Sequence, residues 1–317
     1  MEEPCDEVKR RSGRTRVRRN ILAAWLLTAA IQMEAQNRGV YPLGLTAVNS
    51  GITPGPGFTY SNQLLFYVRD QAKDDDGKTQ PITGSNTVVM DMNSFIWVSK
   101  LKVVGATYSA TATLPFAKND LTSDLNGNIS GGAGFADSYY VPLTLGWTWQ
   151  RVAVKALYGF LAPTGRFVTG GNDNVGSGYW THVLASGQTL YLTESKLLTF
   201  SAFEMYEFHT SQEGTGVRPG ETFDLDYSLL ATLSSSQKFR LQIGPAGYEA
   251  RQTTAKTGPG VTPAESQARY AINALGFAVS GAFPKRKASL ALKLFKEFAD
   301  RSTYQGYSVQ VVGAISF

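Results

Sequence analysis

Residues 306–317 read GYSVQVVGAISF, and their character alternates with a period of two. One face holds Tyr307, Val309, Val311, Gly313, Ile315 and Phe317, of which five are apolar, and the other face is mostly small or polar. This period predicts a β-strand with one apolar face. The stretch carries no charge or proline that would blunt a free edge. It is typical either of a strand that closes a membrane barrel or of the last strand of a soluble sandwich.

Composition favours a strand-rich protein with few charges. The chain has 317 residues, of which 43% are hydrophobic and 17% are charged, against about 25% charged in an average soluble protein. The net charge is +5, but residues 1–35 hold seven basic and five acidic residues. The remainder has 23 basic and 20 acidic residues, a net charge of +3. No large basic surface is expected outside residues 1–35, which argues against nucleic acid as a partner.

Residues 1–35 have the pattern of a secretory signal peptide. A basic stretch at residues 9–19 precedes a mostly apolar stretch at residues 21–31, and cleavage is expected after Ala35. The apolar stretch is shorter than the roughly 20 residues that a membrane-spanning helix needs. A nucleic-acid-binding arm is the alternative interpretation of the basic stretch. The one cysteine, Cys5, lies in this segment, so the mature chain is expected to lack disulfides and a thiol nucleophile.

The rest of the chain predicts an irregular segment and then twelve strands. Residues 36–57 contain Pro42, Pro54 and Pro56 and form the irregular N-terminal segment. Strand patterns follow at residues 58–69, 87–99, 103–114, 139–149, 152–162, 179–193, 197–209, 221–233, 239–252, 269–283, 288–299 and 306–317. Most reach the roughly 9–11 residues of a membrane strand, whereas strands in soluble proteins average about 5–6.

The connections between these strands alternate in length. Long polar links at residues 71–85, 117–135, 164–177, 211–220 and 253–266 alternate with short links near residues 100, 150, 195, 235 and 285. Only residues 300–303 form a short link where a long one is expected. Outer-membrane barrels have short periplasmic turns and longer external loops. We therefore predict an all-β fold, an antiparallel transmembrane barrel of about 12 strands over residues 58–317, in the outer membrane of a Gram-negative bacterium.

Aromatic residues near strand ends agree with a membrane barrel, because outer-membrane barrels carry aromatic girdles at both interfaces. The candidates for outward girdle positions are Tyr139, Trp147, Trp149, Tyr158 and Tyr307.

Strand parity also predicts side chains that line the lumen. The candidates are Asp224, Asp226, Lys155, Arg240, Gln242, Tyr248, Lys293 and Glu297, while parity leaves the facing of Glu204, Glu207, Asn273 and Phe277 open. One interpretation is a charged lining that sets the selectivity of a channel. The other is charge pairing inside a filled barrel, with Arg240 as a partner of Asp224 and Asp226. The terminal residues Tyr307, Val309, Val311, Ile315 and Phe317 are the predicted signal for the barrel-assembly machinery.

A catalytic or metal site is poorly supported. The two histidines, His182 and His209, have Asp173, Ser177 and Ser211 near them in sequence, but no spacing specifies a nucleophile with its base. Two histidines without a mature cysteine argue against zinc, and DDDG at residues 74–77 is more typical of a solvated loop than of a calcium site. We predict no cofactor, no metal and no enzymatic activity, with a hydrolase at the barrel rim as the alternative.

Several short motifs occur in a recognisable order. They are Tyr206-Glu207, Pro219-Gly220-Glu221, Leu225-Asp226-Tyr227, and Gly247-Tyr248 followed by Gln252. In this order, with the opening YPLG and PGPGFTY, they resemble the family named for the meta-pathway of phenol degradation, a family of predicted transporter-like outer-membrane barrels. The resemblance implies passage of small hydrophobic, often aromatic, compounds and supplies no catalytic residues. A structural or adhesive barrel without transport remains a further alternative.

Overall fold

A computed structural model describes residues 39–81 and 83–317 of the chain. The predicted signal peptide, residues 1–35, lies outside the described residues. No helix within the described ranges is long and apolar enough to cross a membrane.

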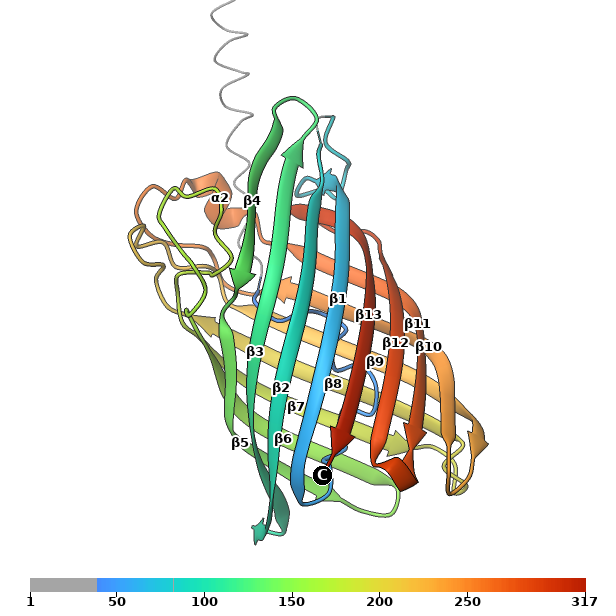
Figure 1. The fold of residues 1–317 in the computed structure, drawn as a ribbon. Coiled ribbons are helices and arrows are strands. Elements are labelled where there is room, and N and C mark those ends of the chain that lie inside the picture. The colour runs from blue at the N-terminus through green and yellow to red at the C-terminus, as the bar shows by residue number, and fades with distance from the viewer. Residues whose placement is uncertain (1–38, 82) are drawn as a thin grey trace, which may run out of the picture. The chain divides into compact units, whose positions relative to one another are not determined.

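The described residues form one antiparallel sheet that closes on itself (Figure 1). The strands are β1 (Gly57–Lys73), β2 (Asn86–Val103), β3 (Ala106–Ser123), β4 (Gly127–Phe135), β5 (Ser138–Thr148), β6 (Val152–Ala162), β7 (Thr181–Tyr191), β8 (Leu198–His209), β9 (Thr222–Ser235), β10 (Arg240–Gln252), β11 (Ala271–Phe283), β12 (Ala288–Glu297) and β13 (Thr303–Ser316). Strand β5 pairs with the first half of β3, and β4 pairs with its second half. Together β4 and β5 therefore count as one interrupted strand. The closed wall therefore has twelve strands, as predicted.

The barrel is polar inside and apolar outside, the reverse of a soluble protein. On β13, Ser308 and Gln310 are buried, while the alternate residues Tyr307 and Ile315 are 44% and 40% exposed. The same alternation on β9 buries Asp226 and exposes Phe223. In a bilayer no water can satisfy a free backbone group, so only a closed barrel lets strands cross. The apolar outer face and the closed ladder together confirm the predicted membrane barrel.

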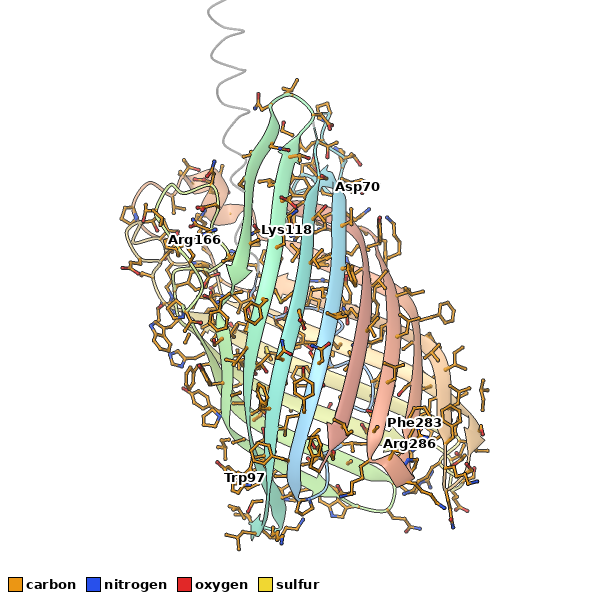
Figure 2. The ribbon with its side chains drawn as sticks, viewed as in Figure 1. Asp70, Trp97, Lys118, Arg166, Phe283 and Arg286 are labelled. Carbon is orange, nitrogen blue, oxygen red and sulfur yellow. The ribbon has the colours of Figure 1, made fainter. Side chains whose placement is uncertain are left out.

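The two ends of the barrel differ. One end, here the turn end, carries short links such as Val104-Gly105 between β2 and β3, where both residues have positive φ as in a type I′ turn. The other, the loop end, carries the long links, including helix α2 (Pro263–Gln267). Figure 2 shows Trp97, Phe283 and Arg286 toward the turn end, and Asp70, Lys118 and Arg166 toward the loop end.

Two predicted boundaries near β3 are wrong. The strand predicted at residues 103–114 begins at Ala106, because Val104 and Gly105 form the turn, and it continues to Ser123. The loop predicted at residues 117–135 is largely strand, since residues 116–123 of β3 pair with β4. On the outer surface these segments carry charged side chains such as Lys118 and Asp120 and several glycines. Their sequence therefore lacks the apolar alternation by which a membrane strand is recognised.

A bulge at Pro142 reverses the facing of half of β5. Against β6, the register shifts between Tyr140 and Leu143, where proline has no N–H to donate. A one-residue insertion moves the preceding side chains to the opposite face. Tyr139 consequently points into the barrel, where it packs with the cluster of Val183, Phe203 and Met205. The predicted girdle position of Tyr139 is therefore wrong, whereas Trp149 and Tyr307 are exposed.

The closure generates a prediction about assembly. Thr59 pairs with Ser316, and Phe317 N donates to Phe58 O at 2.8 Å, so Phe317 ends the seam between β13 and β1. Deleting Phe317 should lower the amount of folded, heat-modifiable barrel in outer-membrane fractions, while Phe317→Tyr, which keeps the aromatic ring, should preserve it. Equal folding and location of the deletion and the parent chain would contradict the assembly role.

Candidate functional site

The described residues that precede β1 lie inside the barrel. Residues 39–56, here called the lumen segment, run from the loop end, where Gly39 N donates to Tyr270 OH at 2.7 Å, toward the turn end, where Gly51 N donates to Thr189 Oγ1 at 3.0 Å. The blue trace of this segment is visible behind the front strands in Figure 1. It forms turns but no strand or long helix, so its backbone N–H and C=O groups need partners on the wall.

Glu207 on β8 holds the segment near the loop end. Its carboxylate accepts hydrogen bonds from Val40 N at 2.9 Å and from Tyr41 N at 2.8 Å. The side chain is fully buried, and His209 Nε2 lies 3.5 Å from Glu207 Oε2. A buried carboxylate needs such donors because its own hydration is lost. Glu207 is thus an anchor that strand parity left unassigned.

Asp226 on β9 holds the middle of the segment. It accepts hydrogen bonds from Tyr41 OH at 2.6 Å, from Gly44 N at 2.7 Å and from Thr46 N at 3.0 Å. Hydrogen bonds to a charged group contribute about 1.5–3 kcal/mol each to stability. Asp226 therefore provides the densest set of contacts between the wall and the segment.

Strands β12 and β13 hold the carbonyl groups of the same turn. Lys293 Nζ on β12 donates to Gly44 O at 2.6 Å and to Leu45 O at 2.5 Å, and Gln310 Nε2 on β13 donates to Leu43 O at 2.7 Å. Gly44 has a φ of 82°, and a Cβ there would lie 2.6 Å from Phe295 Cε2. Only glycine fits this turn, which Asp226 and Lys293 hold from two sides.

Farther toward the turn end the segment is held by both hydrogen bonds and apolar contacts. Ser228 Oγ donates to Ala47 O at 2.6 Å, and Asn49 Nδ2 donates to Gln242 Oε1 at 3.2 Å. Ala47 belongs to a buried cluster on β9 to β12, against which Leu43 and Val48 of the segment also pack. The lumen is therefore filled at this level in the described structure.

The predicted lumen residues all lie on the inner face, but in different roles. Asp226, Gln242 and Lys293 bind the segment, and Tyr248 packs against Gly44. Glu297 accepts from Tyr248 OH at 3.2 Å and from Gly306 N at 2.6 Å, which ties β10, β12 and β13 together. Lys155 lies 5.6 Å from the ring centroid of Phe203.

Asp224 and Arg240 depart from the expected pairing. Arg240 Nη2 lies 3.4 Å from Lys196 O and from Thr232 Oγ1 at the turn end. Asp226 is opposite Tyr248, eight residues farther along β10, a separation of about 26 Å at about 3.3 Å per residue. The predicted pairing of Arg240 with Asp224 or Asp226 is therefore wrong. Asp224 is 2% exposed, and its Oδ2 has no hydrogen-bond partner in the described part of the chain.

The histidines do not meet the serines named from the sequence. His182 faces outward, with Nδ1 2.9 Å from Tyr158 OH. His209 is buried, with Nδ1 2.8 Å from Thr181 Oγ1. Ser177 Oγ donates to Asp137 Oδ2 at 2.6 Å, and Asp173 pairs with Arg166. Within residues 39–81 and 83–317, no hydrogen bond joins either histidine to Ser177, Ser211 or Asp173.

The described residues also contain no group of three or more His, Cys, Asp or Glu side chains arranged to hold a metal ion. The DDDG loop is instead a turn in which Asp74 Oδ1 accepts from Lys78 N at 2.8 Å.

Comparisons with known proteins agree with the barrel. A family model described as "Putative MetA-pathway of phenol degradation" matches residues 69–312. The crystal structure of the COG4313 outer membrane channel from Pseudomonas putida F1 superposes with a TM-score of 0.71 at 13% identity, covering 88% of this chain and 100% of that one. The beta domain of the Bordetella autotransporter Brka gives 0.51 at 12% identity, covering 83% and 100%. A comparison with curated protein sequences found no match.

The two neighbouring aspartates should behave differently when they are replaced. Asp226→Ala removes three acceptor contacts to the lumen segment, whereas Asp224→Ala removes none that the structure shows. In a Val48→Cys background we expect Asp226→Ala to increase the rate of labelling by a water-soluble maleimide at least tenfold, because even ~1.4 kcal/mol of lost docking corresponds to a factor of ten. Single-channel conductance should rise in parallel.

Asp224→Ala is the matched control and should label at the parent rate. Equal labelling of the two variants, with both barrels folded by heat-modifiable mobility, would show that Asp226 does not anchor the segment.

Proposed function

The chain belongs to the family described as putative MetA-pathway of phenol degradation, and we propose that it is an outer-membrane channel for the passive passage of small hydrophobic or aromatic compounds. The observation that carries this proposal is a membrane barrel whose lumen is filled by a segment of its own chain. That segment is held largely by polar contacts and is joined to the wall covalently at Gly57, the first residue of β1.

A segment held in this way can act as a gate. The anchors on Glu207, Asp226 and Lys293 bind backbone atoms of residues 40–46, and water could bond to both partners of each hydrogen bond if the segment moved away, so the polar groups would not be left without partners. A fully apolar plug would lose its whole buried surface on displacement. Movement of the lumen segment toward the loop end would therefore open the barrel without breaking the wall.

The inner wall supports hydrophobic solutes over ions. Val183, Phe203 and Met205 form a buried apolar cluster on the inner face, and Tyr139, Leu157 and Leu161 pack against it. The ring centroid of Tyr41 in the lumen segment lies 5.7 Å from that of Phe203. Displacing the segment would expose this aromatic and thioether surface to the lumen, where an aromatic solute could bind it. Such an apolar surface would offer no favourable contact to a hydrated ion.

The processing and location of the chain follow the same proposal. Residues 1–35 would be removed as a signal peptide, residues 36–57 would form the irregular N-terminal segment, and residues 58–317 would form the barrel in the outer membrane of a Gram-negative bacterium. The outward face of β13, with Tyr307, Val309, Val311, Ile315 and Phe317, would be recognised by the barrel-assembly machinery. Outer-membrane lipid would then cover that face.

Transport can be tested directly in cells. Cells that carry the gene should take up a panel of labelled aromatic compounds faster than cells without it, and Asp226→Ala should increase the uptake further if solutes use the lumen. A chain that leaves uptake of every compound unchanged, although it is present and folded in the outer membrane, would refute the channel and favour a structural or adhesive barrel.

The rim-hydrolase alternative makes a separate prediction. Because the His182 ring lies on the outward face against Tyr158, His182→Ala should leave both solute uptake and folding unchanged. His209→Ala should also leave uptake intact, at some cost in heat resistance, because the ring is buried beside Tyr179. An ester- or lipid-hydrolysing activity of the purified barrel that either replacement abolishes would favour the enzyme.

A further inference from the structure

The short links at the turn end share a strong excess of basic residues. Between the strands that they join, the five links hold six basic residues and one acidic residue, Glu194. The basic residues, here called the basic rim, are all exposed: Arg151, Lys196, Lys238, Lys285, Arg286 and Lys287. This end of the barrel therefore presents a positively charged surface.

The charges at the loop end are paired, whereas those of the basic rim are not. Exposed ion pairs at the loop end join Lys78 with Asp76, Lys118 with Asp120, and Arg166 with Asp173. No residue of the basic rim forms an ion pair with any residue that the structure describes. Arg151, for example, donates to the carbonyl oxygens of Tyr191 and Leu192 and meets no carboxylate. The rim is therefore complementary to anions from outside the chain.

Two neighbouring turns carry the densest part of the basic rim. The turn between β9 and β10 supplies Lys238, and the turn between β11 and β12 supplies residues 285–287. The turns are adjacent because β10 pairs with β11, and the ring centroids of Phe239 and Phe283 lie 5.1 Å apart. Four cations thus lie next to one aromatic pair.

Hydrogen bonds fix the backbone of both turns. In the first turn, Ser236 Oγ accepts from Lys238 N at 3.3 Å. In the second, Lys287 N donates to Pro284 O at 3.1 Å, and Ser316 N at the end of β13 donates to Lys287 O at 2.9 Å. The cations therefore project from ordered turns, so less conformational entropy is lost when an anion binds.

The aromatic pair places these turns at the membrane interface. On β11, Phe277 is 63% exposed and Ala278 is fully buried, so Phe283 has the outward parity of Phe277. Phe239 lies on the same outer side, because a Cβ at Gly281 would lie 3.3 Å from its ring. Membrane barrels carry aromatic girdles at their interfaces with water. The cations, which lie within four residues of these rings, are therefore at the level of the lipid headgroups (Figure 2).

We propose that these two turns bind the headgroup of an anionic phospholipid, such as phosphatidylglycerol. The phosphate lies among Lys238 and residues 285–287, where Arg286 supplies a fork of N–H groups and the lysines supply point charges. The acyl chains lie along the outer wall against Phe239 and Phe283. Phosphatidylethanolamine carries an ammonium group that cancels its phosphate charge, so the turns attract it less strongly.

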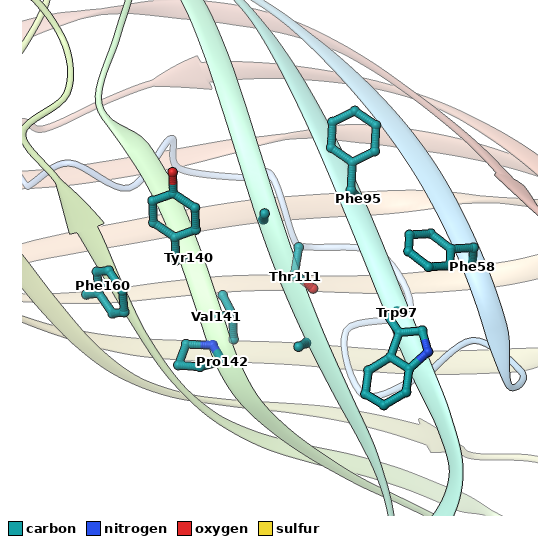
Figure 3. Close-up of a pocket in the computed structure, with 10 residues that line it drawn as sticks. Phe58, Phe95, Trp97, Thr111, Tyr140, Val141, Pro142 and Phe160 are labelled. Carbon is teal, nitrogen blue, oxygen red and sulfur yellow. The ribbon is translucent and has the colours of Figure 1, made fainter.

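An apolar groove elsewhere on the outer wall lacks such charges and serves as a comparison. It has a volume of about 450 Å³ and is lined by Phe95 and Trp97 on one side and by Tyr140 and Phe160 on the other (Figure 3). Ala112 on β3 lies between the two aromatic rows. None of the lining residues is charged. An acyl chain in this groove would therefore not select between headgroups.

The matched probes are phosphatidylglycerol and phosphatidylethanolamine with identical acyl chains, offered in equal amounts to the full barrel in a neutral detergent. Native mass spectrometry counts the molecules of each lipid that stay bound to the folded barrel. At low salt the parent chain should retain phosphatidylglycerol at least about tenfold more often, because each cation near the headgroups adds to the attraction. The preference should fall as the salt concentration is raised, since exposed charges are screened.

Replacements in the two turns test where the lipid binds. Lys285→Gln with Arg286→Gln removes two cations and should lower the preference at least about threefold. Lys285→Arg with Arg286→Lys keeps both charges and should retain it. Lys238→Gln, in the other turn, should lower the preference as well and provides a separate test if the first double variant does not fold.

Two controls leave these turns intact. Lys118→Gln with Arg166→Gln removes two cations that have acidic partners at the loop end and should leave the preference unchanged. Ala112→Leu, which fills the apolar groove, should also leave it unchanged. Heat-modifiable mobility confirms that each variant folds.

Several results would overturn the proposal. Equal retention of the two lipids by the parent chain would do so, as would a preference that persists at high salt or in the folded variant with Lys285→Gln and Arg286→Gln. Displacement of the lipid by an equal concentration of inorganic phosphate would show that the turns bind a free anion and not a lipid. None of these results depends on solute uptake, so the lipid site and the channel can fail separately.

Discussion

The pairing of β1 with β13 is the interaction on which the rest of the structure depends. It joins residues 59–73 to residues 303–316, so that among the described strands only β4 is paired on one side alone. In lipid, an open edge would expose a row of N–H and C=O groups at several kcal/mol each. Closure therefore allows each strand to place apolar side chains outward and polar side chains inward, an arrangement that would unfold a soluble protein. The polar lumen is a direct consequence of this closure.

A polar lumen in turn determines how the interior is filled. Residues 39–56 contain prolines and glycines and cannot add a regular strand, so their backbone groups bind inward side chains. Glu207 and Asp226 accept from N–H groups, while Lys293 and Gln310 donate to C=O groups. The polar side chains of the inner wall thus supply the hydrogen bonds that a neighbouring strand would supply to a regular strand. The sequence left two interpretations open, a charged lining and a filled barrel. In the structure, charged residues of the lining bind the segment that fills the barrel.

Some side chains of the wall face the side opposite to the one that regular alternation of polar and apolar residues predicts. The bulge at Pro142 turns Tyr139 inward, where it joins the apolar cluster beside the lumen segment, and turns Tyr140 outward into the groove. Asp91 and Asn93 break the opposite rule, because they are polar residues on the outer face, in step with the exposed Phe95. The inner apolar cluster and these two outer polar residues are exceptions to the pattern that defines the barrel.

The sequence by itself determined the fold class, the twelve strands and the two unlike ends, because a period of two and link lengths are local properties of the chain. The final strand could be identified from GYSVQVVGAISF alone, and the inward parity of Asp226 and Lys293 follows from their neighbours. Only the tertiary structure decided what these residues contact, since Asp226 and Gly44 are 182 positions apart and meet through barrel closure. The same reason explains why Glu207 was not recognised as an anchor and why Arg240 was expected near Asp226. Parity gives the face of a strand, but register around a closed sheet and the path of an irregular segment decide which faces meet.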